Sequence, residues 1–167
     1  MTSTANGVPG AQLGHGHLKV SDLDRAVAFY RDVVGMREIL RHGDQAAFLA
    51  FDDYHHHLGL NTWESAGGTP PPPGHTGLYH MAFLYPDCAT LGQAIDRVYQ
   101  AGLKLIGAAD HLVSEAVYLS DPDGNGVELY RDRPKAEWSF DANGALQMAN
   151  APLDVKALIS EGRAALS

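Results

Sequence analysis

Hydrophobic and polar positions along the chain follow one plan twice. Each half begins with an alternating segment, continues with apolar residues three or four positions apart, and ends in several short strand-like segments. Alternation is typical of a strand with one buried face, and the wider spacing is typical of an amphipathic helix. The pattern therefore predicts a strand–helix–strands module that occurs twice, within an α+β fold class.

The first copy begins with the alternating segment at residues 13–20 and continues into a helix at residues 23–34. Ser21 or Asp22 can cap the start of this helix, and Gly35 follows it as a stop signal. Three shorter strands are expected next, at residues 37–41, 46–51 and 56–63.

The second copy has the same order, with a strand at residues 78–85 and a helix at residues 89–101. His15 and His80 occupy matching places in the two copies and are separated by 65 positions. Asp22 and Asp87 are separated by the same 65 positions, and the repeated interval supports a duplication. The later strands of the second copy are expected at residues 103–106, 113–120 and 126–130.

Four consecutive prolines at residues 70–73 separate the two copies. Neither a helix nor a strand interior tolerates such a run, so residues 65–76 are expected to form a stiff extended linker. We expect one domain at residues 13–134, made of modules 13–64 and 77–134.

Two segments flank this domain. Residues 1–12 are polar and contain Gly and Pro, and we expect them to form a disordered lead-in. Residues 135–167 form a C-terminal extension, in which an amphipathic helix is expected at residues 153–166. The apolar positions of this helix predict packing against the domain or against a second subunit.

Composition narrows the class of protein and its partners. The 167 residues are 45% hydrophobic and 19% charged, as in an ordinary soluble globular protein. The net charge of −8 and the absence of a Lys or Arg block argue against a nucleic-acid or anionic-membrane partner. No apolar run could span a bilayer and no signal-peptide pattern begins the chain, so we expect a cytoplasmic protein. The single cysteine, Cys88, excludes an internal disulfide.

Three residues predict a metal centre. His15 and His80 lie near the start of the first strand in each copy, and Glu128 lies in the last strand of the second copy. Alternation puts His80, Glu128 and Tyr118 on the polar faces of their strands. Curved sheets with these faces turned inward would form a cup. Two imidazoles and one carboxylate leave coordination positions open, which suits Fe(II) or a related ion that also binds substrate and oxygen.

The simpler interpretation of each histidine is structural. A lone strand histidine is more often a hydrogen-bonded partner than a ligand, but the matching positions of His15 and His80 favour ligation here. For His17 the structural interpretation remains preferred. In the run of residues 55–57, alternation turns His55 and His57 towards the cup and His56 away from it.

The chain resembles a known family in several segments. Residues 14–22 and 29–35 resemble the opening of the vicinal oxygen chelate superfamily, which includes glyoxalase I, bleomycin-resistance proteins and type I extradiol dioxygenases. Residues 111–130 are similar to the extradiol dioxygenase signature. Residues 77–80 and 54–61 look most like catechol-2,3-dioxygenase relatives.

This resemblance implies two paired βαβββ modules that close around a divalent metal. It implies His15, His80 and Glu128 as metal ligands, His111 as the acid–base group and Tyr118 as a nearby hydrogen-bonding group. The implied reaction is cleavage of a catechol-type aromatic diol with O2. The implied metal is Fe(II), with Mn(II), Ni(II) and Zn(II) as alternatives, and the implied assembly is a homodimer.

Two other functions stay open. A glyoxalase-like lyase or isomerase would need a fourth ligand, and His57 aligns with the strand where glyoxalase I carries a carboxylate. His57 could be that ligand, a hydrogen-bond donor beside the ligands, or a substrate contact. A non-catalytic binding protein of the bleomycin-resistance type would need no complete set of metal ligands.

Overall fold

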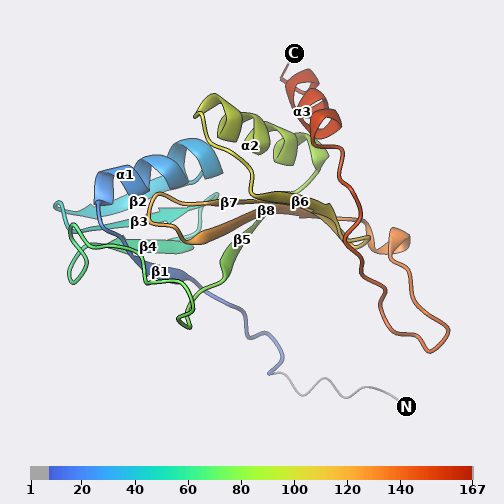
Figure 1. The fold of residues 1–167 in the computed structure, drawn as a ribbon, viewed down its shortest axis with the longest axis horizontal. Helices are drawn as coiled ribbons and strands as arrows, with labels where there is room; N and C mark the ends of the chain where they lie inside the picture. The colour runs from blue at the N-terminus through green and yellow to red at the C-terminus, as the bar shows by residue number, and fades with distance from the viewer. Residues whose placement is uncertain (1–7, 167) are drawn as a thin grey trace.

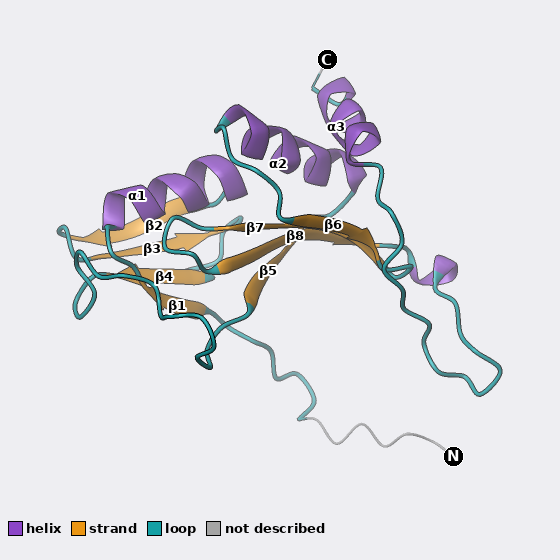
Figure 2. Ribbon diagram, viewed as in Figure 1, coloured by secondary structure: helices purple, strands orange, loops and turns teal. Residues whose placement is uncertain are grey.

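The computed structural model describes residues 8–166 as two four-stranded sheets covered by helices (Figures 1 and 2). Residues 1–7 of the expected lead-in lie outside the described part of the chain. The first sheet contains β1 (Gly16–Lys19), β2 (Arg37–His42), β3 (Ala46–Ala50) and β4 (Leu58–Asn61). The second sheet contains β5 (His80–Leu84), β6 (Gly107–Asp110), β7 (Ser114–Ser120) and β8 (Gly126–Asp132).

Both sheets have the same topology. Their strand orders are β1-β4-β3-β2 and β5-β8-β7-β6. In each sheet the first strand pairs in parallel with the last, and the other neighbours are antiparallel. The predicted duplication and the α+β fold class are confirmed.

The helices lie over one side of the sheets and leave the other side open (Figure 2). In the first module α1 (Leu23–Ala28) runs into the π-helical segment η1 (Phe29–Val34). The second module contributes α2 (Cys88–Gln100). After the modules come the short 3₁₀ helix η2 (Lys135–Glu137) and α3 (Val155–Ala164), which packs on α2 (Figure 1).

The core lies between these helices and the sheets, because each strand turns its apolar face towards them. The largest fully buried side chains come from both modules: Tyr30, Leu49, Leu58, Leu60, Leu91, Ile95, Leu119 and Leu129. Polar contacts also join the modules. The hydroxyl of Tyr85 donates to the carbonyl of Val34 at 2.6 Å. Among the described residues, no helix is long and apolar enough to cross a membrane.

One predicted strand is wrong. Residues 103–106 form no strand, and the sheet edge is formed instead by β6 (Gly107–Asp110). Leu103 and Leu105 pack against the core, whereas Ile106 is exposed. The small residues of β6 have weak intrinsic strand preference, so pairing with β7 determines where this strand lies.

Two glycines allow α3 to lie directly against α2. A Cβ atom on Gly92 would collide with the carbonyl oxygen of Leu158, and one on Gly162 would lie 2.6 Å from the backbone nitrogen of Gln93. Replacing Gly92 by valine is therefore expected to force the two helices apart and lower the free energy of unfolding by about 1–3 kcal/mol. Urea denaturation measures the loss. Gly77→Ala, in open space, is the control, and equal midpoints for the two variants would contradict the close packing.

A buried phenol in the π-helical segment η1 joins the first module to a turn of the second. Tyr30 is fully buried, and its hydroxyl donates to the Asp121 carboxylate at 2.9 Å. Burial, reinforced by that carboxylate, raises the pKa of Tyr30 far above its ordinary value of 10.0. Folding therefore favours the protonated phenol. Its stabilising effect is fully present below about pH 10 and is lost as the pH rises further.

Replacing Tyr30 by phenylalanine is expected to cost about 1–3 kcal/mol of unfolding free energy at neutral pH, because Asp121 loses a donor. It is also expected to make stability fall less steeply above pH 10 than in the unchanged protein. Urea midpoints measured between pH 7 and about pH 11 test both effects. The exposed Tyr99→Phe is the control. An unchanged alkaline slope in Tyr30→Phe would contradict this account.

Candidate active site

Three neighbouring strands turn polar side chains towards the open side of the second sheet. Tyr118 of β7 lies opposite Glu128 of β8, and Ala82 of β5 lies opposite Glu128 on the other side. His80 shares the face of Ala82, because it lies two positions earlier on the same strand. Val127 and Leu129, which face the other way on β8, are buried in the core. The predicted faces of these strands are confirmed.

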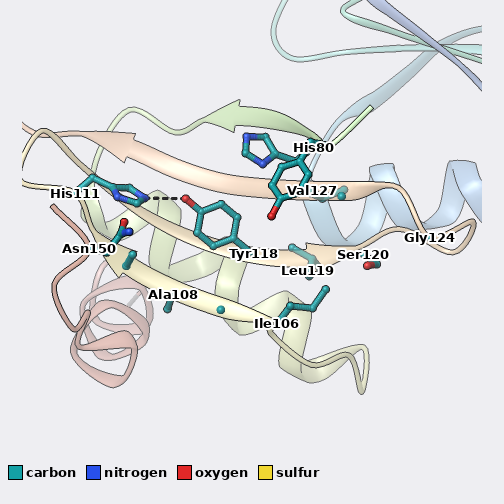
Figure 3. Close-up of a pocket in the computed structure, with 14 residues that line it drawn as sticks. His80, Ile106, Ala108, His111, Tyr118, Leu119, Ser120, Gly124, Val127 and Asn150 are labelled. Carbon is teal, nitrogen blue, oxygen red and sulfur yellow. Dashed lines mark hydrogen bonds between the residues drawn. The ribbon is translucent and has the colours of Figure 1, made fainter. Parts of the chain in front are cut away.

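The polar side chains form one continuous chain of contacts. His80 Nε2 lies 2.9 Å from Glu128 Oε2. The Tyr118 hydroxyl is 3.1 Å from the other oxygen of Glu128, Oε1, and 2.7 Å from Nε2 of His111. Figure 3 shows the contact between His111 and Tyr118 at the pocket wall. The structure thus brings together four of the predicted site residues.

Burial raises the pKa of Tyr118 to about 12, and the Glu128 carboxylate adds to this shift because it disfavours a second negative charge nearby. The phenol therefore stays protonated at neutral pH. A protonated phenol can donate a hydrogen bond to an oxygen that becomes negative during a reaction.

His111 lies in the tight connection between β6 and β7. Its backbone nitrogen donates to the carbonyl of Ser114 at 2.8 Å, and the nitrogen of Leu112 donates to Asp110 Oδ1 at 2.8 Å. Leu112 has a φ of 69°, in the left-handed region that a leucine rarely adopts. Strain of this kind persists where the surroundings hold the backbone, and it is common at functional sites.

A cavity of about 610 Å³ lies beside these residues. His80, His111 and Tyr118 contribute polar atoms to its lining, while Ile106 and Ala108 contribute apolar surface (Figure 3). The volume is in the range of pockets that bind small organic molecules. The combination of apolar wall and few polar groups suits a ring with polar substituents.

The structure does not bring His15 to this group. His15 precedes β1, and its ring packs against the ring of His56, with centroids 4.5 Å apart. Across residues 8–166, no three His, Cys, Asp or Glu side chains are gathered closely enough to hold a metal. Two of the three predicted ligands, His80 and Glu128, therefore converge without the third.

The backbone around His15 nevertheless adjoins the strand that carries His80. A Cβ atom on Gly16 would lie 2.6 Å from the end of the Met81 side chain. Within β5, His80 faces the side opposite to Met81, because neighbouring strand residues point to opposite faces. Imidazole and carboxylate groups are suitable ligands for a divalent metal such as Fe(II), Mn(II) or Zn(II). The chemistry of the predicted ligands fits such an ion.

The other histidines of the first module have structural contacts. Nδ1 of His57 accepts a hydrogen bond from the backbone nitrogen of Phe51 at 3.2 Å. His56, and not His57, lies beside His15. The Asn61 amide donates to Nε2 of His17 at 2.9 Å, as the structural interpretation of His17 expects.

Two contributors from the C-terminal extension were not among the predicted site residues. The carbonyl oxygen of Ala149 lies 3.0 Å from Nδ1 of His111, and Asn150 lines the cavity. A backbone carbonyl has no signature in a sequence, and the extension lies outside the duplicated pattern. No sequence signal could have indicated the role of Ala149.

Comparisons with known proteins agree with this architecture. The chain is 41% identical over 149 residues to catechol-2,3-dioxygenase of Bacillus subtilis, covering 89% of this chain and 51% of the relative. It is 33% identical over 124 residues to biphenyl-2,3-diol 1,2-dioxygenase 3 of Rhodococcus globerulus, covering 72% and 63%. The chain thus spans about half to two thirds of the length of these relatives.

A solved structure, lactoylglutathione lyase from Agrobacterium tumefaciens, superimposes with a TM-score of 0.57 at 28% identity, covering 74% of this chain and 96% of that one. A family model, described as the Glyoxalase/Bleomycin resistance protein/Dioxygenase superfamily, matches residues 12–129. The match covers the first module and continues through β5, β6 and β7 of the second module. It ends within β8. The chain belongs to the glyoxalase/bleomycin resistance protein/dioxygenase superfamily.

Proposed function

We propose that the protein is a metal-dependent extradiol dioxygenase, which opens the ring of a catechol-type aromatic diol with O2 at a bond beside the diol. The observation that carries this proposal is the contact chain His80–Glu128–Tyr118–His111 at the wall of the 610 Å³ cavity. The similarity to two dioxygenases that act on aromatic diols supports the same chemistry.

In this proposal His15, His80 and Glu128 hold a divalent metal, Fe(II) in the first instance, with Mn(II), Ni(II) or Zn(II) as alternatives. When bound, the metal would supply the Lewis acid and the binding position for diol and oxygen. The two convergent donors, 2.9 Å apart, support the assignment of His80 and Glu128. The assignment of His15 rests on the chemistry of its imidazole and on the neighbouring contact of Gly16 with Met81.

The residues of the chain would have separate tasks. His111 accepts the proton of a substrate hydroxyl and returns a proton to the product, the role that a positioned imidazole most often has in acid–base catalysis. Tyr118 donates to the substrate oxygen on which negative charge develops. Ile106 and Ala108 provide the apolar wall against which the aromatic ring lies, and they keep water from that side of it.

Oxygen uptake by protein reconstituted with Fe(II) tests this function. The metal is added under nitrogen, and a panel of catechols is then added with air. A yellow ring-opened product with matching oxygen consumption is expected. Protein loaded with Zn(II), which has no redox chemistry, is the control and is expected to consume none. No oxygen uptake with any catechol by the Fe(II) protein would contradict the proposal.

A second candidate is a metal-dependent lyase or isomerase, favoured by the structural similarity to lactoylglutathione lyase. In this case Ni(II) or Zn(II) would act only as a Lewis acid, and His57 would be tested as a further ligand. Turnover of lactoylglutathione under nitrogen would favour this candidate. His57 already accepts the Phe51 backbone hydrogen bond through Nδ1, which leaves Nε2 for such a role.

A homodimer also remains a prediction. Light scattering on the purified protein measures the molar mass directly. A value of twice the 17.9 kDa chain is expected, and the mass of one chain would contradict it.

A further inference from the structure

The C-terminal extension adds a short piece of strand to the free edge of the second sheet. β6 is the last strand of that sheet, and Ala151 forms an antiparallel bridge with its residue Asp110. Asp110 N donates to the Ala151 carbonyl at 3.0 Å, and Ala151 N donates back at 2.9 Å. The Ala149 nitrogen also donates to the carbonyl of His111 at 3.3 Å. Asn150, between these residues, lines the cavity beside His111 (Figure 3).

This pairing brings a backbone acceptor to the ring of His111. Nδ1 lies 3.0 Å from the carbonyl oxygen of Ala149. A carbonyl can only accept, so Nδ1 must carry the hydrogen. In a neutral imidazole the other nitrogen, Nε2, then has a lone pair and can only accept. The single hydrogen of the Tyr118 hydroxyl has two acceptors in reach, Nε2 at 2.7 Å and Glu128 Oε1 at 3.1 Å, and with this tautomer it is donated to the nearer one, Nε2. The ring is thus held with its basic nitrogen towards the pocket.

We propose that residues 149–151 are a positioning segment of the active site, in which the Ala149 carbonyl fixes His111 in the tautomer that turns a basic Nε2 towards Tyr118 and the cavity. The catalytic part of this proposal rests on the proposed function, which makes His111 the acid–base group. The tautomer itself does not depend on that function.

The segment is anchored on both sides, so its carbonyl is held in place. Before it, the indole of Trp138 donates to the carbonyl of Arg133 at 2.9 Å, and Phe140 pairs with Leu146. After it, α3 (Val155–Ala164) docks on α2 (Cys88–Gln100) through the glycine contacts described above.

The partner strand is anchored as well. The Arg133 guanidinium binds Asp110 at 2.6 Å and Glu115 of β7 at 2.8 Å. Asp110 is therefore fixed at the point where it pairs with Ala151. Because the backbone is held on both sides of the bridge, the Ala149 carbonyl can orient the His111 ring. Catalytic histidines are commonly oriented by a hydrogen-bond partner of this kind.

Replacing Ala151 by proline tests the segment, because proline removes the backbone N–H that donates to Asp110. The matched control is Ala142→Pro. Ala142 is the second residue of the turn at residues 141–144, which Gly144 closes by donating to the Asp141 carbonyl at 2.9 Å, and proline suits that position. Both variants add one proline to the extension, but only Ala151→Pro breaks the pairing beside His111.

The primary readout is the ¹⁵N NMR spectrum of the imidazole rings in the metal-free full chain at about pH 8, where an ordinary imidazole is neutral. The His111 signals are assigned by their loss in His111→Gln. The unchanged protein and Ala142→Pro are expected to hold His111 as the Nδ1–H tautomer. Ala151→Pro is expected to show a substantial Nε2–H fraction.

Kinetics supply the second readout. Ala151→Pro is expected to lower kcat by about 10–100-fold, with a smaller change in KM and unchanged metal content. An Nε2–H ring in the unchanged protein would overturn the proposal without any variant. An unaltered tautomer and kcat in a folded Ala151→Pro protein would also overturn it. If no diol is turned over but the tautomer responds as expected, the proposed function fails and the positioning stands.

Discussion

Replacing Glu128 by glutamine is expected to remove the bound metal and to lower kcat by more than about 100-fold. Loss of a residue that only hydrogen-bonds a metal ligand typically lowers metal affinity or activity by about 10–100-fold. Removing the charge of a ligand itself should lower them further. Glutamine keeps the size of the side chain and its contacts with His80 and Tyr118, but it removes the negative charge that attracts the cation. Metal analysis after dialysis, together with kcat on catechol, measures both effects.

Glu64→Gln is the matched control for this variant. Glu64 is an exposed carboxylate that lies 3.6 Å from Lys19, away from the pocket-lining strands. The same chemical change at this position is expected to leave metal content and kcat unaltered. Full metal content in Glu128→Gln would show that Glu128 is not a ligand.

Replacing His111 by glutamine is expected to separate acid–base catalysis from metal binding. The variant should retain the metal, because His111 contacts Tyr118 and Ala149 but neither of the convergent donors. Its kcat is expected to fall by about 10²–10⁴-fold, the usual contribution of a positioned acid–base group. Metal analysis and steady-state kinetics on one protein preparation measure the two properties together.

His75→Gln is the control, since His75 is an exposed residue whose Nδ1 lies near the Pro72 carbonyl at 3.1 Å. Loss of metal from His111→Gln would reassign His111 as a ligand. An unchanged kcat with normal metal content would remove it from the catalytic scheme.

Much of the architecture follows from local pattern. The two copies, the helix that begins after Asp22 and the polar faces of β5, β7 and β8 were all predictable. Each depends on side-chain periodicity and capping, which act over a few residues. The convergence of His80, Glu128 and Tyr118 then follows, because adjacent strands in register put side chains of one face together.

The failures have equally specific causes. Alternation turned His57 towards the cup, but residues 52–57 form no strand, and Asp52 has a φ of 50°. A period of two holds only in extended backbone, so β4, which begins at Leu58, gives no guide to the side chains before it. His56 consequently lies beside His15. These contacts depend on turns whose geometry no periodicity encodes.

The edge of the second sheet could not be predicted for a different reason. The apolar residues 103–106 have the stronger strand character, yet hydrogen bonding to β7 selects the small residues of β6. The Ala149 carbonyl contacts His111 in a segment that pairs with β6 at residue 151 and leads into α3, which docks on α2. Such long-range contacts are properties of the assembled fold, and a single sequence contains no local signal for them.

Incorporation of labelled oxygen tests the central claim most directly. Fe(II)-loaded protein is mixed with catechol under ¹⁸O₂, and the ring-opened product is analysed by mass spectrometry before its oxygens exchange with water. A dioxygenase is expected to deliver both atoms of O2 to the product. Product without label, or turnover at the same rate under nitrogen, would contradict the proposed dioxygenase.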